Sequence, residues 1–269
     1  MGKLSKLING IVALAKQPSL INLVLDSSQY HEKIVRKKFP EVADGLRQIS
    51  FADITPSTKI TVTPFAFLEG GSLPTDLALL KILAEKKTDC TYFEIGTWRG
   101  ESVANVAVVA KECFTLNLSA QQMNTLGLSK EYIDLHEFFS KNLGNVKHLY
   151  GHSHTFDFKD FHQRVDVVFV DGDHHYESVL KDTQTAFSLL KNEESVVVWH
   201  DYSQGPEIVR YEVFRGIWEG TPVEKRKHLY KVENTQCAVY YPFDVKAKKV
   251  LYPQTPQYSF EVELKIISL

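Results

Sequence analysis

The sequence is poor in cysteine and has no long hydrophobic run. Its three cysteines, Cys90, Cys113 and Cys237, lie far apart, and no two of them form a C-x-x-C pair. A sparse, odd number of cysteines argues against a disulfide framework and favours reduced thiols in a cytoplasmic protein. No apolar stretch approaches the roughly 20 residues that a membrane-spanning helix requires, so we expect no membrane span.

Neither sign of charge is in excess. The chain of 269 residues has 31 basic and 33 acidic side chains, a formal net charge of −2 and a pI near 6.6. This balance provides no global attraction to nucleic acid or to an anionic membrane, and we expect no nucleic-acid partner. A hydrophobic content of 43% is enough for a sizeable core and favours one large domain with appendages.

Residues 1–60 are predicted to form a helical N-terminal extension that precedes a domain of residues 61–269. Apolar residues recur at helical spacing near the start of the chain, at Leu4, Leu7, Ile8, Ile11, Val12, Leu14 and Ala15. This pattern predicts a packed amphipathic helix that acts as a lid or as a homodimer contact. Docking of the helix on a membrane surface is the alternative.

From Thr91 onward, strand patterns and helix patterns alternate. The expected strands are TYFEI, CFTLNL, VKHLY, VDVVFV and SVVVW, and the expected helices are Ser102–Lys111, Lys130–Asn142, Ser178–Leu190 and Tyr202–Trp218. This alternation predicts an α/β fold with a mostly parallel, doubly wound sheet. HLYKV and QCAVYYP predict an antiparallel hairpin in the tail, and Tyr258–Ile267 is expected to add one more strand.

Two of the expected strands end in acids and histidines. VDVVFV is followed by Asp171, Asp173, His174 and His175, and SVVVW is followed by His200 and Asp201. Continuous β-branched runs are typical of strands that are buried on both faces of a parallel sheet. Ligands of open α/β sheets bind beyond the carboxyl ends of the strands. The sequence therefore predicts one site to which both strands contribute carboxylate and imidazole groups.

The turn after the first expected strand, TYFEI, is rich in glycine. In FEIGTWRGES, Gly96 and Gly100 permit a tight turn and a close approach of backbone to ligand, and the next helix begins with free N–H groups. The G-x-x-x-G spacing differs from the G-x-G-x-x-G of dinucleotide-binding proteins, and the G-K-[ST] of a P-loop is absent. Glu94 would repel a pyrophosphate but attract an ammonium group.

In combination, FEIGTWRGES, VDVVFVDGDHHYESVLKD and VVVWHDY resemble the class I S-adenosylmethionine-dependent methyltransferases. The resemblance is greatest to the small-molecule O-methyltransferase branch related to macrolide-sugar and cephalosporin-biosynthesis enzymes, and it covers Thr91–Tyr202 and the tail hairpin. It implies a Rossmann-like methyltransferase fold, a mostly parallel seven-stranded sheet with a C-terminal antiparallel hairpin. It also implies methyl transfer from S-adenosylmethionine to an oxygen of a small-molecule acceptor.

The resemblance further implies where the cofactor binds. Glu94, Gly96 and Gly100 would hold the methionine part, and Ser153 would contact the adenine. Asn117 stands where the family usually has an acid that binds both ribose hydroxyls, and its amide offers one donor and one acceptor group instead. The complete cofactor-binding set that the resemblance implies is Glu94, Gly96, Thr97, Gly100, Asn117, Ser153 and Asp171.

A divalent metal is expected at the acidic rim of this site. Metal-dependent relatives bind Mg²⁺ with carboxylates at the positions of Asp171 and Asp201, and His200 precedes the second of these. Two or three carboxylates suffice for Mg²⁺, whereas an imidazole ligand would shift the preference toward a transition metal. The alternative is that both aspartates only cap the turns that follow them.

Methyl transfer to an alcohol or phenol also requires a base. An imidazole with a pKa near ~6.5 can accept the proton at physiological pH, and His174 is the expected general base. His175 is the second choice, and Asp173 is expected to orient the imidazole.

Two other functions are compatible with these motifs. A metal-dependent hydrolase would use Asp171, Asp173 and Asp201 to turn over a phosphate or an ester. A catalytically silent binding protein would retain the fold and the cofactor without methyl transfer. The identity of the acceptor has no recognisable sequence signature.

Overall fold

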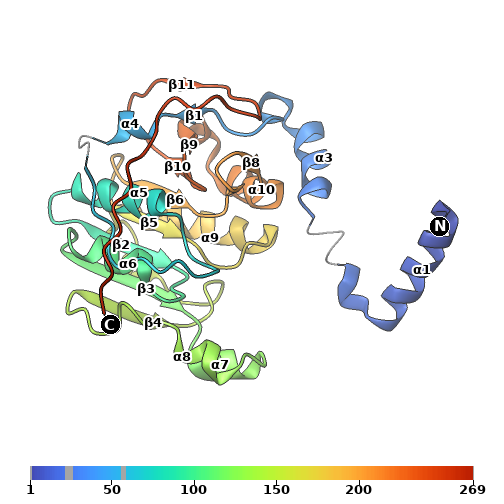
Figure 1. Cartoon of the computed structure of the whole chain (residues 1–269), viewed down its shortest axis with the longest axis horizontal. Coiled ribbons are helices and arrows are strands. Elements are labelled where there is room, and N and C mark those ends of the chain that lie inside the picture. The colour runs from blue at the N-terminus through green and yellow to red at the C-terminus, as the bar shows by residue number, and fades with distance from the viewer. Residues whose placement is uncertain (1, 22–26, 56–58, 269) are drawn as a thin grey trace.

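A nine-stranded sheet forms the centre of the molecule in the computed structural model, which describes residues 2–21, 27–55 and 59–268 (Figure 1). The strand order is β11-β1-β9-β10-β6-β5-β2-β3-β4. These strands are β1 (Gln48–Ile49), β2 (Thr91–Ile95), β3 (Glu112–Asn117), β4 (Val146–Tyr150), β5 (Val167–Val170), β6 (Val196–Trp199), β9 (Leu229–Val232), β10 (Ala238–Tyr240) and β11 (Ala247–Lys248).

Strands β2 to β6 are parallel to one another, and β10 is antiparallel to both β6 and β9. The predicted parallel sheet with an antiparallel tail hairpin is therefore confirmed, and the fold is the Rossmann-like methyltransferase fold. The sheet has two strands more than the seven expected, because β1 and β11 join its β9 edge. Each of these has only two residues, too few to show an alternating pattern.

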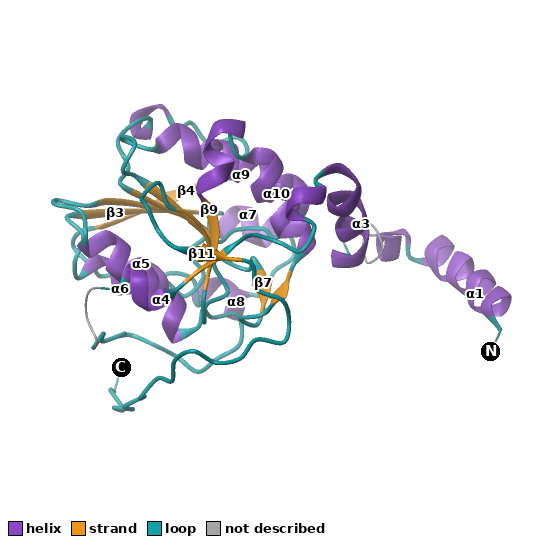
Figure 2. Cartoon of the chain, turned by 90° about the horizontal axis from the view of Figure 1, so that it is seen from above, coloured by secondary structure: helices purple, strands orange, loops and turns teal. Residues whose placement is uncertain are grey.

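Helices cover both faces of the sheet (Figure 2). One layer contains α4 (Phe51–Ile54), α5 (Pro74–Glu85) and α6 (Glu101–Ala107), and the other contains α3 (Ser28–Lys38), α9 (Tyr176–Leu189) and α10 (Tyr211–Gly220). Two short helices, α7 (Ala120–Thr125) and α8 (Lys130–Asp134), lie between β3 and β4 in sequence. The 3-10 turns are η1 (Pro18–Ile21), η2 (Pro40–Val42), η3 (Lys159–Phe161) and η4 (Val223–His228).

The side chains of the central strands alternate between two buried clusters. Phe93, Val168 and Val197 belong to the cluster beneath α9 and α10, whereas Tyr92 and Val167 belong to the cluster beneath α5. Every residue of β5 and β6 is buried. This double coverage explains why both strands are continuous apolar runs in the sequence.

Several predicted elements have different bounds in the structure. Within the predicted helix Tyr202–Trp218, a small hairpin of β7 (Ser203–Gln204) and β8 (Ile208–Val209) precedes α10. Of Lys130–Asn142, only α8 is helical. The strand expected at Tyr258–Ile267 is wrong, because the segment is extended but unpaired. It runs over the α4–α6 layer (Figures 1 and 2), where the Ser50 Oγ donates to the Tyr258 hydroxyl over 2.9 Å.

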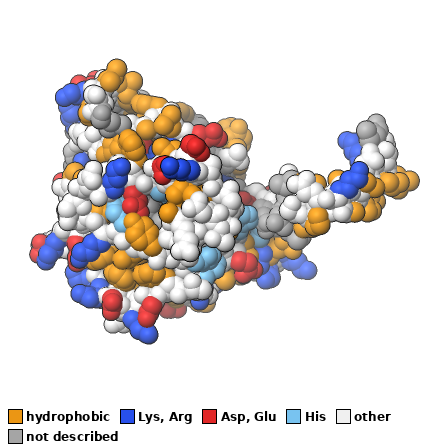
Figure 3. All heavy atoms as spheres, turned by 90° about the horizontal axis from the view of Figure 1, so that it is seen from below, with side chains coloured by type: hydrophobic (Ala, Val, Ile, Leu, Met, Phe, Trp, Pro, Cys, Tyr) orange, Lys and Arg blue, Asp and Glu red, His pale blue; other side chains and the backbone are white. Residues whose placement is uncertain are grey.

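The N-terminal residues divide into two parts. Helix α3 packs on α10 and β1 lies in the sheet, so both belong to the main body. The predicted amphipathic helix is confirmed as α1 (Lys3–Lys16), but none of its residues is buried. Together with η1 it forms an arm, residues 3–21, that projects from the body (Figures 1 and 3). No helix in the described part of the chain has the length and apolarity that a bilayer crossing requires.

Candidate functional site

The glycine turn after β2 brings two strand ends into backbone contact. Gly96 has a φ of +95°, and a Cβ placed there would lie 2.0 Å from the carbonyl oxygen of Asp171. The Asp171 N–H donates to the Ile95 carbonyl over 2.8 Å. Only glycine permits both the left-handed conformation and this approach. The sequence therefore fixes the end of β2 against the end of β5.

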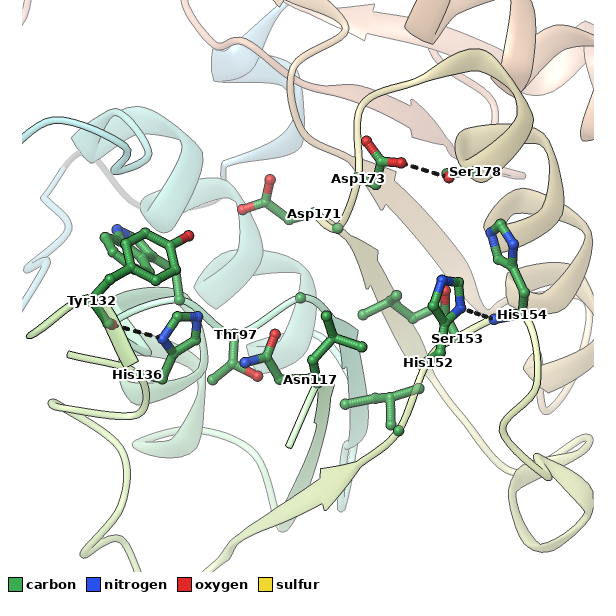
Figure 4. Close-up of a pocket in the computed structure, with 17 residues that line it drawn as sticks. Thr97, Asn117, Tyr132, His136, His152, Ser153, His154, Asp171, Asp173 and Ser178 are labelled. Atoms are coloured by element: carbon green, nitrogen blue, oxygen red, sulfur yellow. Dashed lines mark hydrogen bonds between the residues drawn. The ribbon is translucent and has the colours of Figure 1, made fainter. Parts of the chain in front are cut away.

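A pocket of about 250 Å³ opens beside this contact, at the carboxyl ends of β2, β3, β4 and β5 (Figure 4). The predicted cofactor residues Gly96, Thr97, Asn117, Ser153 and Asp171 all line it. The Nδ2 atom of Asn117 is buried and has no hydrogen-bond partner among the described residues. An amide donor in this condition is available to a ligand, because leaving it unpaired is costly.

Two of the predicted cofactor residues do not line the pocket. Gly100 caps α6 with a φ of +79°, and a Cβ there would lie 2.2 Å from the Ser140 Oγ. Glu94 is fully buried beneath the turn, and its Oε2 accepts a 2.6 Å hydrogen bond from the Tyr92 hydroxyl. Burial raises the pKa of Glu94 to about 8. Both residues therefore contribute to the packing around the glycine turn and not to the lining of the pocket.

Sequence reasoning missed an aromatic wall on one side of the pocket. Tyr132, from α8, and His136 line the pocket together with Trp98 (Figure 4). The Trp98 and Tyr132 ring centroids are 4.4 Å apart, and His136 packs edge-on to Trp98 at 5.0 Å. Aromatic faces of this kind attract a cation. The aromatic content of Lys130–Asn142 was the available signal, but it does not reveal which strand end the segment covers.

The predicted metal ligands converge at the acidic rim. Asp171, His200 and Asp201 each offer a ligand atom, and these three atoms lie within 4.8 Å of one another. The His200 Nδ1 is 3.2 Å from the Asp171 Oδ1 and 3.1 Å from the Asp201 Oδ2. Parallel strands place their carboxyl ends at one edge, which is why residues thirty positions apart meet here.

A fourth residue, Asp76, was not predicted. It contacts the His200 ring nitrogen that faces away from Asp171 and Asp201. Its Oδ2 is 3.2 Å from the His200 Nε2, and its side chain is 0% exposed. Its Oδ1 accepts from the Gln236 N–H over 2.8 Å, and its Oδ2 accepts from the Leu73 N–H at the start of α5. A short polar residue three positions into a helix has an ordinary capping role, so its position in the sequence does not indicate a contact with His200.

Neighbouring charges shift the pKa values of His200 and Asp201 in opposite directions. Burial lowers the pKa of His200, but the charge of Asp171 and hydrogen bonds with Asp171, Asp201 and Asp76 outweigh burial and hold it well above its usual value. Burial would raise the pKa of Asp201, but His200, His174 and Arg210 together hold it well below its usual value. The rim is therefore a cluster of opposite charges with little access to solvent.

A second hollow of about 320 Å³ lies on the other side of Asp201. Its lining consists entirely of polar side chains: Asp201, Gln204, Arg210, Glu212 and Gln236. The Arg210 Nη1 is 2.9 Å from the Asp201 Oδ1. Since Asp171 lines the first pocket and Asp201 lines this one, the Asp171–His200–Asp201 cluster borders both spaces.

The two candidate bases have different partners. The His174 Nε2 is 3.2 Å from the Asp201 Oδ2, so His174 contacts the acidic rim, although it lines neither space. The His175 Nδ1 hydrogen-bonds Asp173, which also accepts from the Ser178 Oγ over 2.7 Å (Figure 4). Asp173 therefore contacts the second-choice histidine, His175. The carboxylate beside His174 is Asp201.

The comparison with protein families agrees with this geometry. Residues 93–202 match a family model described as a methyltransferase domain. That segment begins in β2 and ends just beyond Asp201, so it contains both glycines of the turn and the acidic rim. The segment that carries the glycine turn and the acidic rim is therefore similar to a methyltransferase domain. No curated protein sequence matches the chain.

Several solved structures share part of the fold. YcgJ from Bacillus subtilis is 16% identical with a TM-score of 0.35, over 46% of this chain and 48% of that chain. Spermidine synthase from Thermotoga maritima is 13% identical with a TM-score of 0.41, over 62% and 57%. CalS10, an amino pentose methyltransferase from Micromonospora echinaspora, is 14% identical with a TM-score of 0.34, over 46% and 49%. The chain spans about half the length of the structures that it matches.

Proposed function

We propose that the protein transfers a methyl group from S-adenosylmethionine to a hydroxyl oxygen of a small polar molecule. The observation that carries this proposal is that the acidic rim borders two spaces, one beside the glycine turn and one lined by polar side chains only. Two substrates bound on either side of Asp171 and Asp201 would meet at this point. Methyl transfer in line between two bound groups depends chiefly on such positioning.

The first pocket fits the cofactor. Asn117 supplies a buried amide donor without a partner, and Ser153 lies across the pocket from the aromatic wall. Trp98 and Tyr132 provide aromatic faces for a sulfonium cation. When bound, S-adenosylmethionine supplies the electrophilic methyl group, and the residues of this pocket hold and orient it.

His174 is the general base of this proposal. The imidazole would accept the proton of the acceptor hydroxyl as that oxygen takes the methyl group, which S-adenosylmethionine would supply with S-adenosylhomocysteine as the leaving product. Asp201, 3.2 Å from the His174 Nε2, orients the ring and stabilises the imidazolium that results. His174 is partly exposed, with a side-chain exposure of 41%, so the proton can pass from it to solvent.

Asp171, His200 and Asp201 fit a divalent metal. In His200, the nitrogen that faces the two aspartates is Nδ1, while Nε2 contacts the carboxylate of Asp76. Ligating histidines commonly donate their other N–H to a carboxylate in this way. A metal at this position would lower the pKa of an acceptor hydroxyl.

The second space favours an acceptor with several hydroxyl groups. Its carboxylates accept hydrogen bonds, its amides both donate and accept, and Arg210 donates. Arg210 already pairs with Asp201 and Glu212, and an apolar acceptor would offer no hydrogen bond to the donor and acceptor positions that remain. Polyhydroxylated acceptors such as glycosides or catechols therefore fit this lining.

Calorimetry with S-adenosylmethionine tests the donor, and we expect a dissociation constant near the micromolar range; an absence of heat at high protein concentration contradicts the proposal. Transfer of radiolabelled methyl to a panel of glycosides and catechols then tests the acceptor. On a productive acceptor, His174→Gln should lower kcat by roughly 10²–10⁴-fold and leave cofactor affinity unchanged. His175→Gln is the matched control, with a change of less than about threefold.

A phosphatase assay, together with the calorimetry and the methyl-transfer panel, distinguishes the competing functions. A metal-dependent hydrolase would release p-nitrophenol from p-nitrophenyl phosphate in the presence of Mg²⁺ or Mn²⁺ and would be indifferent to S-adenosylmethionine. A silent binding protein would give calorimetric heat with the cofactor but no labelled product with any acceptor.

A further inference from the structure

The arm, residues 3–21, presents an apolar face that nothing in the described chain covers. Its exposed side chains are large and hydrophobic: Leu4 is 71% exposed, Leu7 60%, Ile8 54%, Ile11 59% and Val12 48%. At 100° per residue, these positions and Leu14 fall on one side of α1. Figure 3 shows the hydrophobic side chains along one edge of the arm. Burying this face is favourable for any partner that can accept it.

All charges on α1 have the same sign. Lys3, Lys6 and Lys16 are its only charged residues, and no acidic residue precedes Asp26 in the sequence. Lys3 and Lys16 flank the apolar face on its two sides, and Lys6 lies on the polar side. The rest of the chain has 28 basic and 33 acidic residues, so its formal charge is −5 while that of α1 is +3. Positive charge is thus concentrated where the apolar face is exposed.

We propose that α1 binds the surface of an anionic lipid bilayer, with its apolar face among the acyl chains and its lysines at the headgroups. A helix with a large apolar face, a lysine-bearing polar face and no acidic residue is the kind that lies in a membrane interface. Lysines at the borders of such a face can extend their ammonium groups to the lipid phosphates. The proposal concerns the location of the protein and is independent of its catalytic function.

A second copy of the chain is a poorer partner for this face. Pairing of two α1 helices would bring lysines together at the borders of the contact, and α1 has no acidic residue to pair with them. Its 14 residues also amount to only two heptads, whereas a coiled coil is typically sustained over three or four. The acidic body offers charge complementarity, but the arm projects away from it (Figure 1).

Co-sedimentation of the full chain with lipid vesicles tests the proposal. We expect binding to vesicles of phosphatidylcholine with phosphatidylserine, and binding weaker by about fivefold per lysine to phosphatidylcholine alone. The double variant Leu7→Asn/Ile11→Asn should bind at least about tenfold less. The control Ser5→Asn/Ala13→Asn introduces the same two asparagines outside the apolar face and should bind like the wild type.

Each outcome has a definite meaning. Because α1 has no buried residue, both double variants should unfold at the wild-type temperature, so a loss of binding reports on the arm alone. Equal sedimentation with both vesicle types, equal loss in both double variants, or no sedimentation of the wild type would overturn the proposal. A dimer in analytical ultracentrifugation that Leu7→Asn/Ile11→Asn dissociates, without vesicle binding, would assign the face to a second copy instead.

Discussion

Replacing Glu94 by glutamine should make the protein more stable at alkaline pH. Glu94 is fully buried, and burial raises its pKa from 4.5 to about 8. A buried acid that binds its proton more tightly in the folded state contributes stability below pH 4.5, and this contribution disappears as the pH rises through about 8. Glutamine mimics the protonated acid, and its oxygen can still accept the hydrogen bond from Tyr92.

The size of the effect follows from the shift in pKa. A difference of one pKa unit corresponds to about 1.4 kcal/mol, so ionising Glu94 in the folded protein costs about 5 kcal/mol in all. Between about pH 4.5 and 8, the free energy of unfolding of the wild type should fall by about 1.4 kcal/mol per pH unit relative to Glu94→Gln. The difference should level off above pH 8.

Urea denaturation at half-unit steps from pH 5 to 8.5 measures this difference, with the fluorescence of buried Trp199 as one signal. All other titrating groups are common to both proteins and cancel. Glu112→Gln, on the neighbouring strand β3 at a partly exposed position, is the control and should give a flat difference within about 0.5 kcal/mol. A flat difference for Glu94→Gln as well would refute the account of Glu94 as a neutral, buried support of the turn.

Two further substitutions test the geometry of the site. Gly96→Ala should abolish detectable binding of S-adenosylmethionine in calorimetry, because the new Cβ would lie 2.0 Å from the Asp171 oxygen and push β2 and β5 apart. Gly127→Ala is the control: Gly127 also has a positive φ, but a Cβ there would meet open space, so cofactor affinity should persist. Asp76→Asn should weaken Mn²⁺ binding by about 10–100-fold, since His200 loses its orienting carboxylate. Wild-type cofactor affinity in Gly96→Ala, or unchanged Mn²⁺ affinity in folded Asp76→Asn, would contradict these assignments.

The sequence by itself determined the order and type of the central elements. The runs VDVVFV and SVVVW predicted β5 and β6 because strands buried on both faces need no polar alternation. The acids after those strands predicted that Asp171 and Asp201 would contribute to one site, since parallel strands end at a common edge. These inferences depend only on local pattern and on the geometry of a parallel sheet.

Only the tertiary structure decided which side chains complete the site. Asp76 reaches His200 from a helix 124 positions earlier, and Arg210 reaches Asp201 from beyond a small hairpin that no pattern indicated. The alternating segment Tyr258–Ile267 has the pattern of a strand, but it pairs with no strand in the described part of the chain. The amphipathic pattern of α1 likewise predicted a helix but not its surroundings. Periodicity records which face of an element is apolar, whereas the packing of distant segments decides what that face meets.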